Sequence, residues 1–218
     1  MARKSFQLEL EQLQQDILKM GALVEKAIAD AVRSLADKDL VLAQEVVDGD
    51  DFIDELELSI ENCCLRLLAL QQPMASDLRV IGTALKIVTD LERMADYAVD
   101  IAKITIRLQG QPLIKPLIDV PRMASIAQDM TRQSLDAFVE RDVNMALSMI
   151  EMDHEVDHLY SQVFRELLTY MMADPRTINQ ATYLLFVARY LERIADHATN
   201  LGEWIIYMVT GEKKELNR

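Results

Sequence analysis

The chain has 218 residues, half of them apolar, so its length suits one large or two small domains with a substantial core. Its 36 acidic residues outnumber 23 basic ones and give a formal net charge of −13, which argues against nucleic acid or anionic membrane as the main partner. No stretch approaches the ~20 apolar residues that span a bilayer, and the N-terminus MARKSFQLEL lacks an apolar signal core. We therefore expect a cytoplasmic protein without direct membrane insertion.

Apolar residues recur at helical spacing along nearly the whole chain, and no alternating strand pattern of useful length appears. In the first segment the apolar positions are Leu13, Ile17, Met20, Val24, Ala27, Ala31 and Leu35. Only 6 Gly and 5 Pro occur, against 12 Met, a composition that suits packed helices. The pattern predicts a protein made of helices.

Breaks in the helical pattern divide the chain into six long segments. They fall at residues 35–40, 70–77, 109–121, 139–143 and 172–177. Pro and Gly concentrate in the middle break, which we interpret as a linker. The predicted fold is all-α, a tandem pair of similar antiparallel three-helix bundles with six long helices. The two units are expected to span residues 1–111 and 119–218.

The two halves share sequence, which indicates a tandem duplication. The segment TDLERMADYAVDIA (89–102) matches RYLERIADHATNLG (189–202) at an offset of 100 residues. The segment DKDLVLAQEVVDGDDFIDEL (37–56) matches ERDVNMALSMIEMDHEVDHL (140–159) at an offset of 103. Two matches at nearly equal offset indicate a repeated unit of about 100 residues, close to the typical size of a small domain.

A His-Glu-x-x-His pattern, the signature of helical zinc proteases, occurs at His154, Glu155 and His158. The matching segment of the first half, DDFIDEL (50–56), does not contain it. On a helix both histidines point roughly 140–180° away from the apolar seam, toward water. We therefore interpret them as solvated histidines and not as protease ligands.

Both halves do share pairs of acidic residues four positions apart. The pairs are Asp50/Asp54 and Glu92/Asp96 in the first half, and Asp153/Asp157 and Glu192/Asp196 in the second. Each pair lies to one side of the apolar seam of its helix, at about 100° per residue. Consecutive helices joined by a short loop pack antiparallel, so the four acids of each unit are predicted to meet at one helix–helix margin.

Such clusters call for a positive charge. Like charges at this spacing cost about 0.2–0.5 kcal/mol per pair. A multivalent cation with oxygen ligands compensates this repulsion directly, and carboxylates suit Mg, Ca, Mn and iron. We predict one metal site in each unit. The alternative left open is a solvated acidic face, in which Arg93 and Arg193 neutralise neighbouring acids.

The two predicted sites are not identical. Asp100 continues the first row of acids and is a further candidate ligand, whereas Asn200 stands at the matching place in the second half. The second site is therefore expected to hold metal more weakly or in a smaller cluster, unless Glu151 offsets the difference.

Two other functions remain open at this stage. One is a carboxylate-bridged metalloenzyme of the ferritin type, which places its ligands inside a four-helix bundle. The acids here border the seam and do not fill it, and no nucleophile–base pair is visible, so we expect a protein that is not an enzyme. The other is a helical adaptor that binds no metal.

Two local expectations complete the analysis. Ser76 or Asp77, with Asp77 preferred, is expected to cap the third helix of the first unit. The adjacent Cys63 and Cys64 are expected to pack as core residues without forming a disulfide.

Together these residues resemble the PhoU family, the bacterial regulators of the phosphate-specific transport system. The resemblance is carried by the tandem units, the acidic pairs, the strings LERMAD and LERIAD, and the segment PMASDLRVIGTALKI (73–87). It covers nearly the whole chain.

The resemblance implies multinuclear metal clusters on the surface of the bundles, of iron or zinc, with Mg or Mn as further candidates. The residues carried over as ligands are Asp50, Asp54, Glu92, Asp96, Asp100, Asp153, Asp157, Glu192 and Asp196. The string SDLR adds Arg79 as a candidate partner contact.

The implied function is regulatory. Members of the family signal phosphate sufficiency between the ATPase subunit of the phosphate transporter and a membrane sensor histidine kinase. They restrain uptake and keep the phosphate-starvation response off. The resemblance implies a cytoplasmic homodimer that reaches the inner membrane through its partners.

Overall fold

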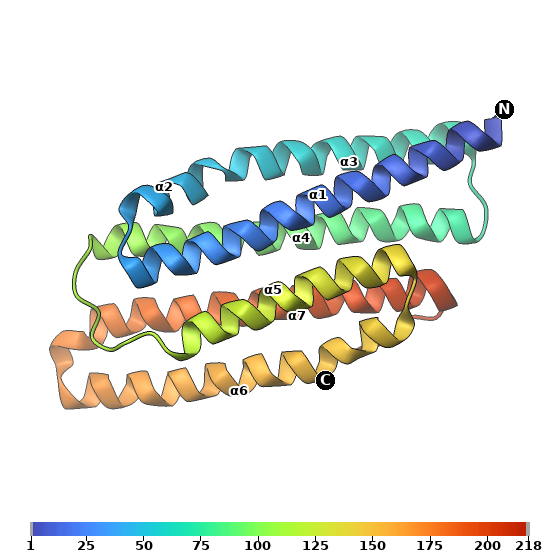
Figure 1. Cartoon of the computed structure of the whole chain (residues 1–218). Helices are drawn as coiled ribbons and strands as arrows, with labels where there is room; N and C mark the ends of the chain where they lie inside the picture. Colours follow the sequence, from blue (N-terminus) through green and yellow to red (C-terminus); the bar gives the residue numbers. More distant parts are fainter. Residues whose placement is uncertain (1, 217–218) are drawn as a thin grey trace.

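The computed structural model describes residues 2–216 and is helical throughout, with no strand in that range (Figure 1). The helices are α1 (Ala2–Asp37), α2 (Leu40–Asp48), α3 (Asp50–Gln71), α4 (Ser76–Leu108), α5 (Asp119–Glu140), α6 (Val143–Ala173), the 3₁₀ helix η1 (Pro175–Thr177) and α7 (Ile178–Thr210). The prediction of an all-α fold with two three-helix bundles is confirmed. The second long helix of the first bundle is interrupted at Gly49, which separates α2 from α3.

The helices form one body with a continuous core. The first bundle consists of α1, α2–α3 and α4, and the second of α5, α6 and α7. The bundles meet where α4 packs along α7 and α1 packs against α5 (Figure 1). All the buried apolar side chains of both bundles belong to a single cluster. The α3 and α6 helices therefore lie at opposite flanks, each next to the third helix of its own bundle.

The linker between the halves is attached to the second bundle. It leaves α4 through two residues with positive φ, Gln109 at 49° and Gly110 at 69°. The backbone N–H of Ile114 then donates to the side chain of Gln180, and the buried Lys115 forms an ion pair with Glu166 of α6. These contacts fix how the first bundle leads into the second.

The helices α2 and α6 begin with the same kind of side-chain cap, whereas α4 begins without one. The Asp39 carboxylate accepts backbone N–H groups at the start of α2, and Asp142 does the same at α6. The expected cap by Ser76 or Asp77 is wrong, because α4 already begins at Ser76, directly after Ala75, whose φ is 47°. Asp77 lies inside the first turn, where its charge still favours the helix dipole.

The two cysteines occupy neighbouring positions on α3. Cys64 is fully buried in the core, and Cys63 is half-buried at its edge. Both are free thiols. The expectation of core packing without a disulfide is confirmed.

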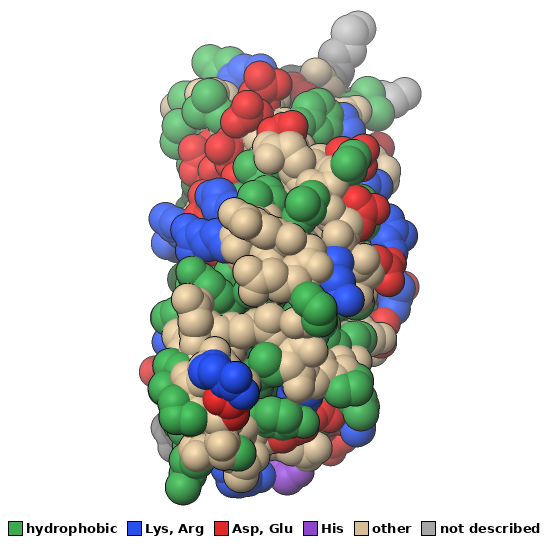
Figure 2. Space-filling view, turned by 90° about the vertical axis from the view of Figure 1, so that its left-hand side faces the viewer, with side chains coloured by type: hydrophobic (Ala, Val, Ile, Leu, Met, Phe, Trp, Pro, Cys, Tyr) green, Lys and Arg blue, Asp and Glu red, His purple; other side chains and the backbone are tan. Residues whose placement is uncertain are grey.

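Negative charge is concentrated on the first half of the molecule. Residues 39–61, in α2 and α3, contain nine Asp or Glu and no Lys, Arg or His. In the end-on view of Figure 2, acidic side chains gather toward the top, the side of α2 and α3, and basic side chains lie below them. None of the described helices is long and apolar enough to cross a membrane.

Replacing a helical glycine by alanine should change the free energy of unfolding in opposite directions at Gly202 and Gly82. A Cβ on Gly202 would lie 2.9 Å from Met149 Cε and 3.1 Å from the Ala146 carbonyl oxygen, so Gly202→Ala should lower the free energy of unfolding by about 1–3 kcal/mol. A Cβ on Gly82 would meet nothing within 4 Å, so Gly82→Ala should raise it by about 1 kcal/mol. Urea titrations followed by circular dichroism measure both. A Gly202→Ala protein as stable as the parent would contradict the close approach of α6 and α7.

Candidate metal sites

The first candidate site lies between α3 and α4. Asp50 begins α3 directly after the break at Gly49, and Asp54 follows one turn later. Glu92 and Asp96 lie one turn apart in the middle of α4, which packs against α3. We call these four carboxylates the first acidic margin.

The carboxylates of the first acidic margin repel one another. Burial, followed by the negative charges of Asp54 and Asp96, raises the pKa of Asp50 to about 6. Burial and then the charge of Asp96 raise the pKa of Glu92 to about 7, although Arg93 acts in the opposite direction. The structure therefore brings the four predicted residues of this half into one electrostatic group.

Glu57 joins this margin and was missed by the sequence analysis. Burial raises its pKa, as do the charges of Glu61, Asp54 and Asp96. Glu57 lies three residues after Asp54, a spacing that also places two side chains on one helix face. Glu57 is also four residues from Glu61, but Tyr160 stands at its matching place in the second half, so the pair is not shared by the two halves.

The second candidate site lies between α6 and α7. Asp153, on α6, and Glu192, on α7, are buried, with only 6% and 8% of their surfaces exposed. Burial and the charges of Asp157 and Asp196 raise the pKa of Asp153 to about 6. Burial and then the charge of Asp196 raise the pKa of Glu192 to about 6. Asp153, Asp157, Glu192 and Asp196 form the second acidic margin.

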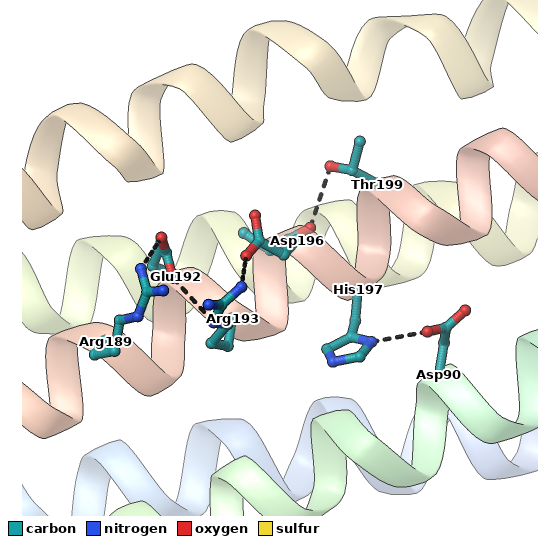
Figure 3. Close-up of polar contacts among 8 residues, drawn as sticks. Asp90, Arg189, Glu192, Arg193, Asp196, His197 and Thr199 are labelled. Carbon is teal, nitrogen blue, oxygen red and sulfur yellow. Dashed lines mark hydrogen bonds and ion pairs between the residues drawn. The ribbon is translucent and has the colours of Figure 1, made fainter. Parts of the chain in front are cut away.

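Arginines pair with the α7 side of the second margin (Figure 3). Arg189 binds Glu192 Oε1, and Arg193 lies 2.9 Å from Asp196. Glu192 Oε2 is buried and has no hydrogen-bond partner, with the guanidinium of Arg193 no closer than 3.9 Å. One carboxylate oxygen of this margin is thus left without a donor.

The first margin is paired in the same way. Arg93 lies 3.2 Å from Asp96 and 3.5 Å from Glu92. The alternative in which Arg93 and Arg193 neutralise neighbouring acids is therefore part of the observed arrangement. Arg189 was missed by the sequence analysis, although its three-residue spacing from Glu192 is a recognisable helix pair.

Asp100 interacts with groups outside the first margin, although it was predicted to continue that row of acids. The Asp100 carboxylate is 4.0 Å from the Lys103 ammonium. Burial and then the charge of Asp100 raise the pKa of Tyr190 on α7. Asn200, its counterpart in the second half, is half-buried on α7. The two margins thus differ at this position, as the sequences indicate.

The histidines of the His-Glu-x-x-His stretch lie on the exposed side of α6, although the charge of His154 acts on Asp153 and Asp157 of the second margin. His154 and His158 are exposed on α6, as predicted, and Glu155 between them forms an ion pair with Arg122 of α5. Two pairs, Glu151/His154 and Glu155/His158, have the Glu-x-x-His spacing of ferritin-type sites, but all four residues are exposed, whereas such ligands face a bundle core. Among residues 2–216, no group of three or more Asp, Glu, His or Cys side chains is already positioned to hold a metal ion.

The fold and the two margins define a class: tandem three-helix bundles with a duplicated carboxylate cluster between their second and third helices. A family model described as the PhoU domain matches the chain twice, over residues 17–105 and 120–205. The chain belongs to the PhoU family.

Similar proteins cover the chain from end to end. The phosphate-specific transport system accessory protein PhoU homolog of Clostridium acetobutylicum is 44% identical over the whole of both chains. Its counterpart in Aquifex aeolicus is 47% identical over 94% of this chain and 92% of its own.

Solved structures agree with this likeness. The crystal structure of PhoU from Pseudomonas aeruginosa superposes with a TM-score of 0.90 at 43% identity, covering 95% of this chain and 100% of the other. The phosphate transport system regulatory protein PhoU from Streptococcus pneumoniae gives 0.89 at 33% identity over 96% and 99%.

The raised pKa values predict that the chelator-treated protein loses stability as pH rises from about 4 to about 7. In this window the folded state binds more protons than the unfolded state, because the pKa values of Asp50 and Glu92 are raised from their usual 3.8 and 4.5. The free energy of unfolding therefore falls as pH rises. Thermal unfolding at pH 5.0 and 7.5 measures the difference. Glu92→Gln should reduce it, and Glu11→Gln, at an exposed position on α1, should not. Stability that rises over this range would contradict the mutual repulsion.

Proposed function

We propose that this chain is a non-enzymatic regulator of phosphate uptake and of the phosphate-starvation response. It would act in the cytoplasm as a homodimer, linking the ATPase subunit of a phosphate transporter to a sensor histidine kinase and keeping the response off when phosphate is sufficient. The observation that carries this proposal is the match of the whole chain, in both halves, to proteins named as accessory or regulatory proteins of phosphate transport.

The proposal includes a bound metal ion at each acidic margin. The donor chemistry fits such an ion, because each margin supplies four carboxylates and Glu192 Oε2 is a buried oxygen without a hydrogen-bond partner. Burial and mutual repulsion already raise the pKa of Asp50, Glu92, Asp153 and Glu192. When bound, the ion would supply the positive charge that the carboxylates lack and leave a fixed surface for a protein partner.

The arginines beside the margins compete with a cation for the same oxygens. Arg93 holds Asp96 and Glu92, and Arg193 holds Asp196. The carboxylates must leave these guanidinium groups before three of them can converge on one ion. Arg93 and Arg193 therefore keep the metal-free margins neutral enough to stay folded and set how tightly a cation binds.

Loss of the margin acids should remove bound metal and its stabilising effect. A divalent cation at 100 times its dissociation constant stabilises the folded state by about 2.7 kcal/mol. Asp50→Asn with Glu92→Gln should abolish the effect at the first margin, and Asp153→Asn with Glu192→Gln at the second. Elemental analysis and thermal unfolding with iron, zinc or manganese measure both. Arg93→Gln should increase affinity at the first margin. Equal metal content in the parent and all variants would show that the margins are solvated acidic faces.

Partner identity is tested by recovering the tagged full-length chain from phosphate-replete cells, followed by mass spectrometry. We expect the ATPase subunit of the phosphate transporter, the sensor histidine kinase, or both. Cells starved of phosphate and an unrelated helical bundle with the same tag serve as controls. Absence of both partners under replete conditions would overturn the proposed role.

A further inference from the structure

The outer face of α4 and α7 is an uncovered helix pair. The α1 and α5 helices pack against α4 and α7 from one side, and no described segment packs over the opposite side between them. The two helices run antiparallel there, with Asp90 opposite His197 and Tyr97 opposite Tyr190. We call this surface the α4–α7 outer face.

A row of aromatic side chains follows the middle of this face. Tyr97 of α4 stacks on Tyr190 of α7 with ring centroids 5.6 Å apart, and Tyr190 continues to Phe186 at 6.2 Å. Tyr97 also lies 5.8 Å from His197, which is 2.7 Å from Asp90 (Figure 3). Phe186 is 48% exposed. Large aromatic groups left partly in water are typical of protein interfaces.

The row ends at Trp204, whose ring is approached by two lysines. The ammonium of Lys86 lies 5.5 Å from the indole centroid, and that of Lys213 lies 5.1 Å away. Trp204 is the only tryptophan in the chain and is half-exposed. Gly82, one turn before Lys86, leaves open space beside it. This end of the face therefore has room for a further side chain next to an aromatic ring and two positive charges.

Three basic groups on this face have no carboxylate partner within the described part of the chain. No described carboxylate lies within 4.0 Å of Lys86, Arg107 or Lys213. The acids of the face are already engaged, Asp90 with His197 and Asp100 with Lys103. Three basic groups thus remain uncompensated in a protein of net charge −13. A partner complementary to them carries negative charge.

Arg79, a predicted partner contact, belongs to the scaffold of this face. Its Nε donates to the backbone oxygen of Met208, 3.0 Å away, in the last turns of α7. Thr83 donates to the backbone oxygen of Trp204 at 3.4 Å. These two bonds tie the start of α4 to the end of α7 and hold Trp204 beside Lys86.

The face is also where the two repeats diverge. At the offset of 100 residues, Asp90 corresponds to Tyr190 and Tyr97 to His197, within segments that otherwise match. Each half therefore supplies one of the stacked tyrosines and one member of the Asp–His pair, and the two pairs lie at different places along the α4–α7 contact. The resulting surface has distinct ends, which a partner can bind in one orientation only.

We propose that the α4–α7 outer face binds an acidic amphipathic helix of a partner protein. The groove between two antiparallel helices accepts a third helix, whose apolar side chains would lie on Phe186, Tyr190 and Tyr97. Its carboxylates would meet Lys86 and Lys213 at one end and Arg107 at the other. Lys86 and Arg107 are separated by about 30 Å of helix at 1.5 Å per residue, so the helix has about 20 residues.

The acidic helix would belong to one of the protein partners in the proposed regulatory role. This proposal rests on the proposed function only because it requires a protein partner. Nucleic acid fits the face less well, because three uncompensated basic groups spread over this length offer few phosphate contacts. Binding to the acidic margins would instead select a basic partner. The sign of the charge that binds therefore separates these alternatives.

The test uses the full-length protein and labelled 20-residue helical peptides with leucine on one face and either glutamate or lysine on the other. We expect the glutamate peptide to bind, measured by fluorescence anisotropy, and to change the emission of Trp204. The double variant Lys86→Glu/Lys213→Glu should weaken binding by at least about tenfold, as expected for reversed charges at an interface. The control Lys19→Glu/Arg66→Glu makes the same charge change at exposed positions of α1 and α3 and should leave binding unchanged.

A steric variant completes the test. A Cβ at the exposed Gly82, one turn before Lys86, meets nothing within 4 Å, so Gly82→Leu should project a side chain onto this face and weaken peptide binding while circular dichroism stays unchanged. Equal binding of the lysine peptide, tighter binding of a 20-nucleotide single strand, or glutamate-peptide binding that survives all variants would overturn the inference. If the transporter ATPase or the kinase is still recovered with Lys86→Glu/Lys213→Glu, the regulatory role stands and this docking surface fails alone.

Discussion

Repulsion between carboxylates that cannot move apart is the constraint on which the functional part of this structure depends. In each half, two acidic pairs lie on neighbouring helices whose apolar seams are buried in the common core. Separating the acids would require separating the helices, and that would expose the seam. The hydrophobic core therefore holds the carboxylates together, and burial, followed by repulsion between neighbouring carboxylates, raises the pKa of Asp50, Glu92, Asp153 and Glu192.

The same constraint explains the arginines. Arg93 and Arg193 each follow a margin glutamate directly. Each forms an ion pair with the aspartate three residues further on, Asp96 or Asp196. A guanidinium on the same helix can offset part of the repulsion without any change of fold. It does so incompletely, since Glu192 Oε2 stays without a hydrogen-bond partner. The unpaired Glu192 oxygen is the feature on which the proposed cation site depends.

Duplication placed two acidic margins on one molecule, and the packing of the bundles created a third surface that neither unit has alone. The margins lie at the flanks, between α3 and α4 and between α6 and α7. The α4–α7 outer face runs between them and carries aromatic and basic groups. Two acidic surfaces and one surface with aromatic and basic groups thus lie on one molecule.

The sequence by itself determined the helices, the duplication and the acidic pairs of each margin, because these follow from spacings along one helix and from the repeat, whereas Glu57 was recognised as part of the first margin only in the structure. Period and offset placed Asp153 and Asp157 on the same side of α6, and the exposure of His154 and His158 followed from the same geometry. Only the tertiary structure decided how deeply Glu192 is buried and that Asp90 meets His197 across the bundle interface. Those properties depend on how the packed helices are rotated about their axes and shifted along them relative to one another. Many contacts between residues far apart in the chain set this arrangement, so no local spacing encodes it. The cap expected at Asp77 failed for a related reason, since the conformation of Ala75 in the loop moved the helix start.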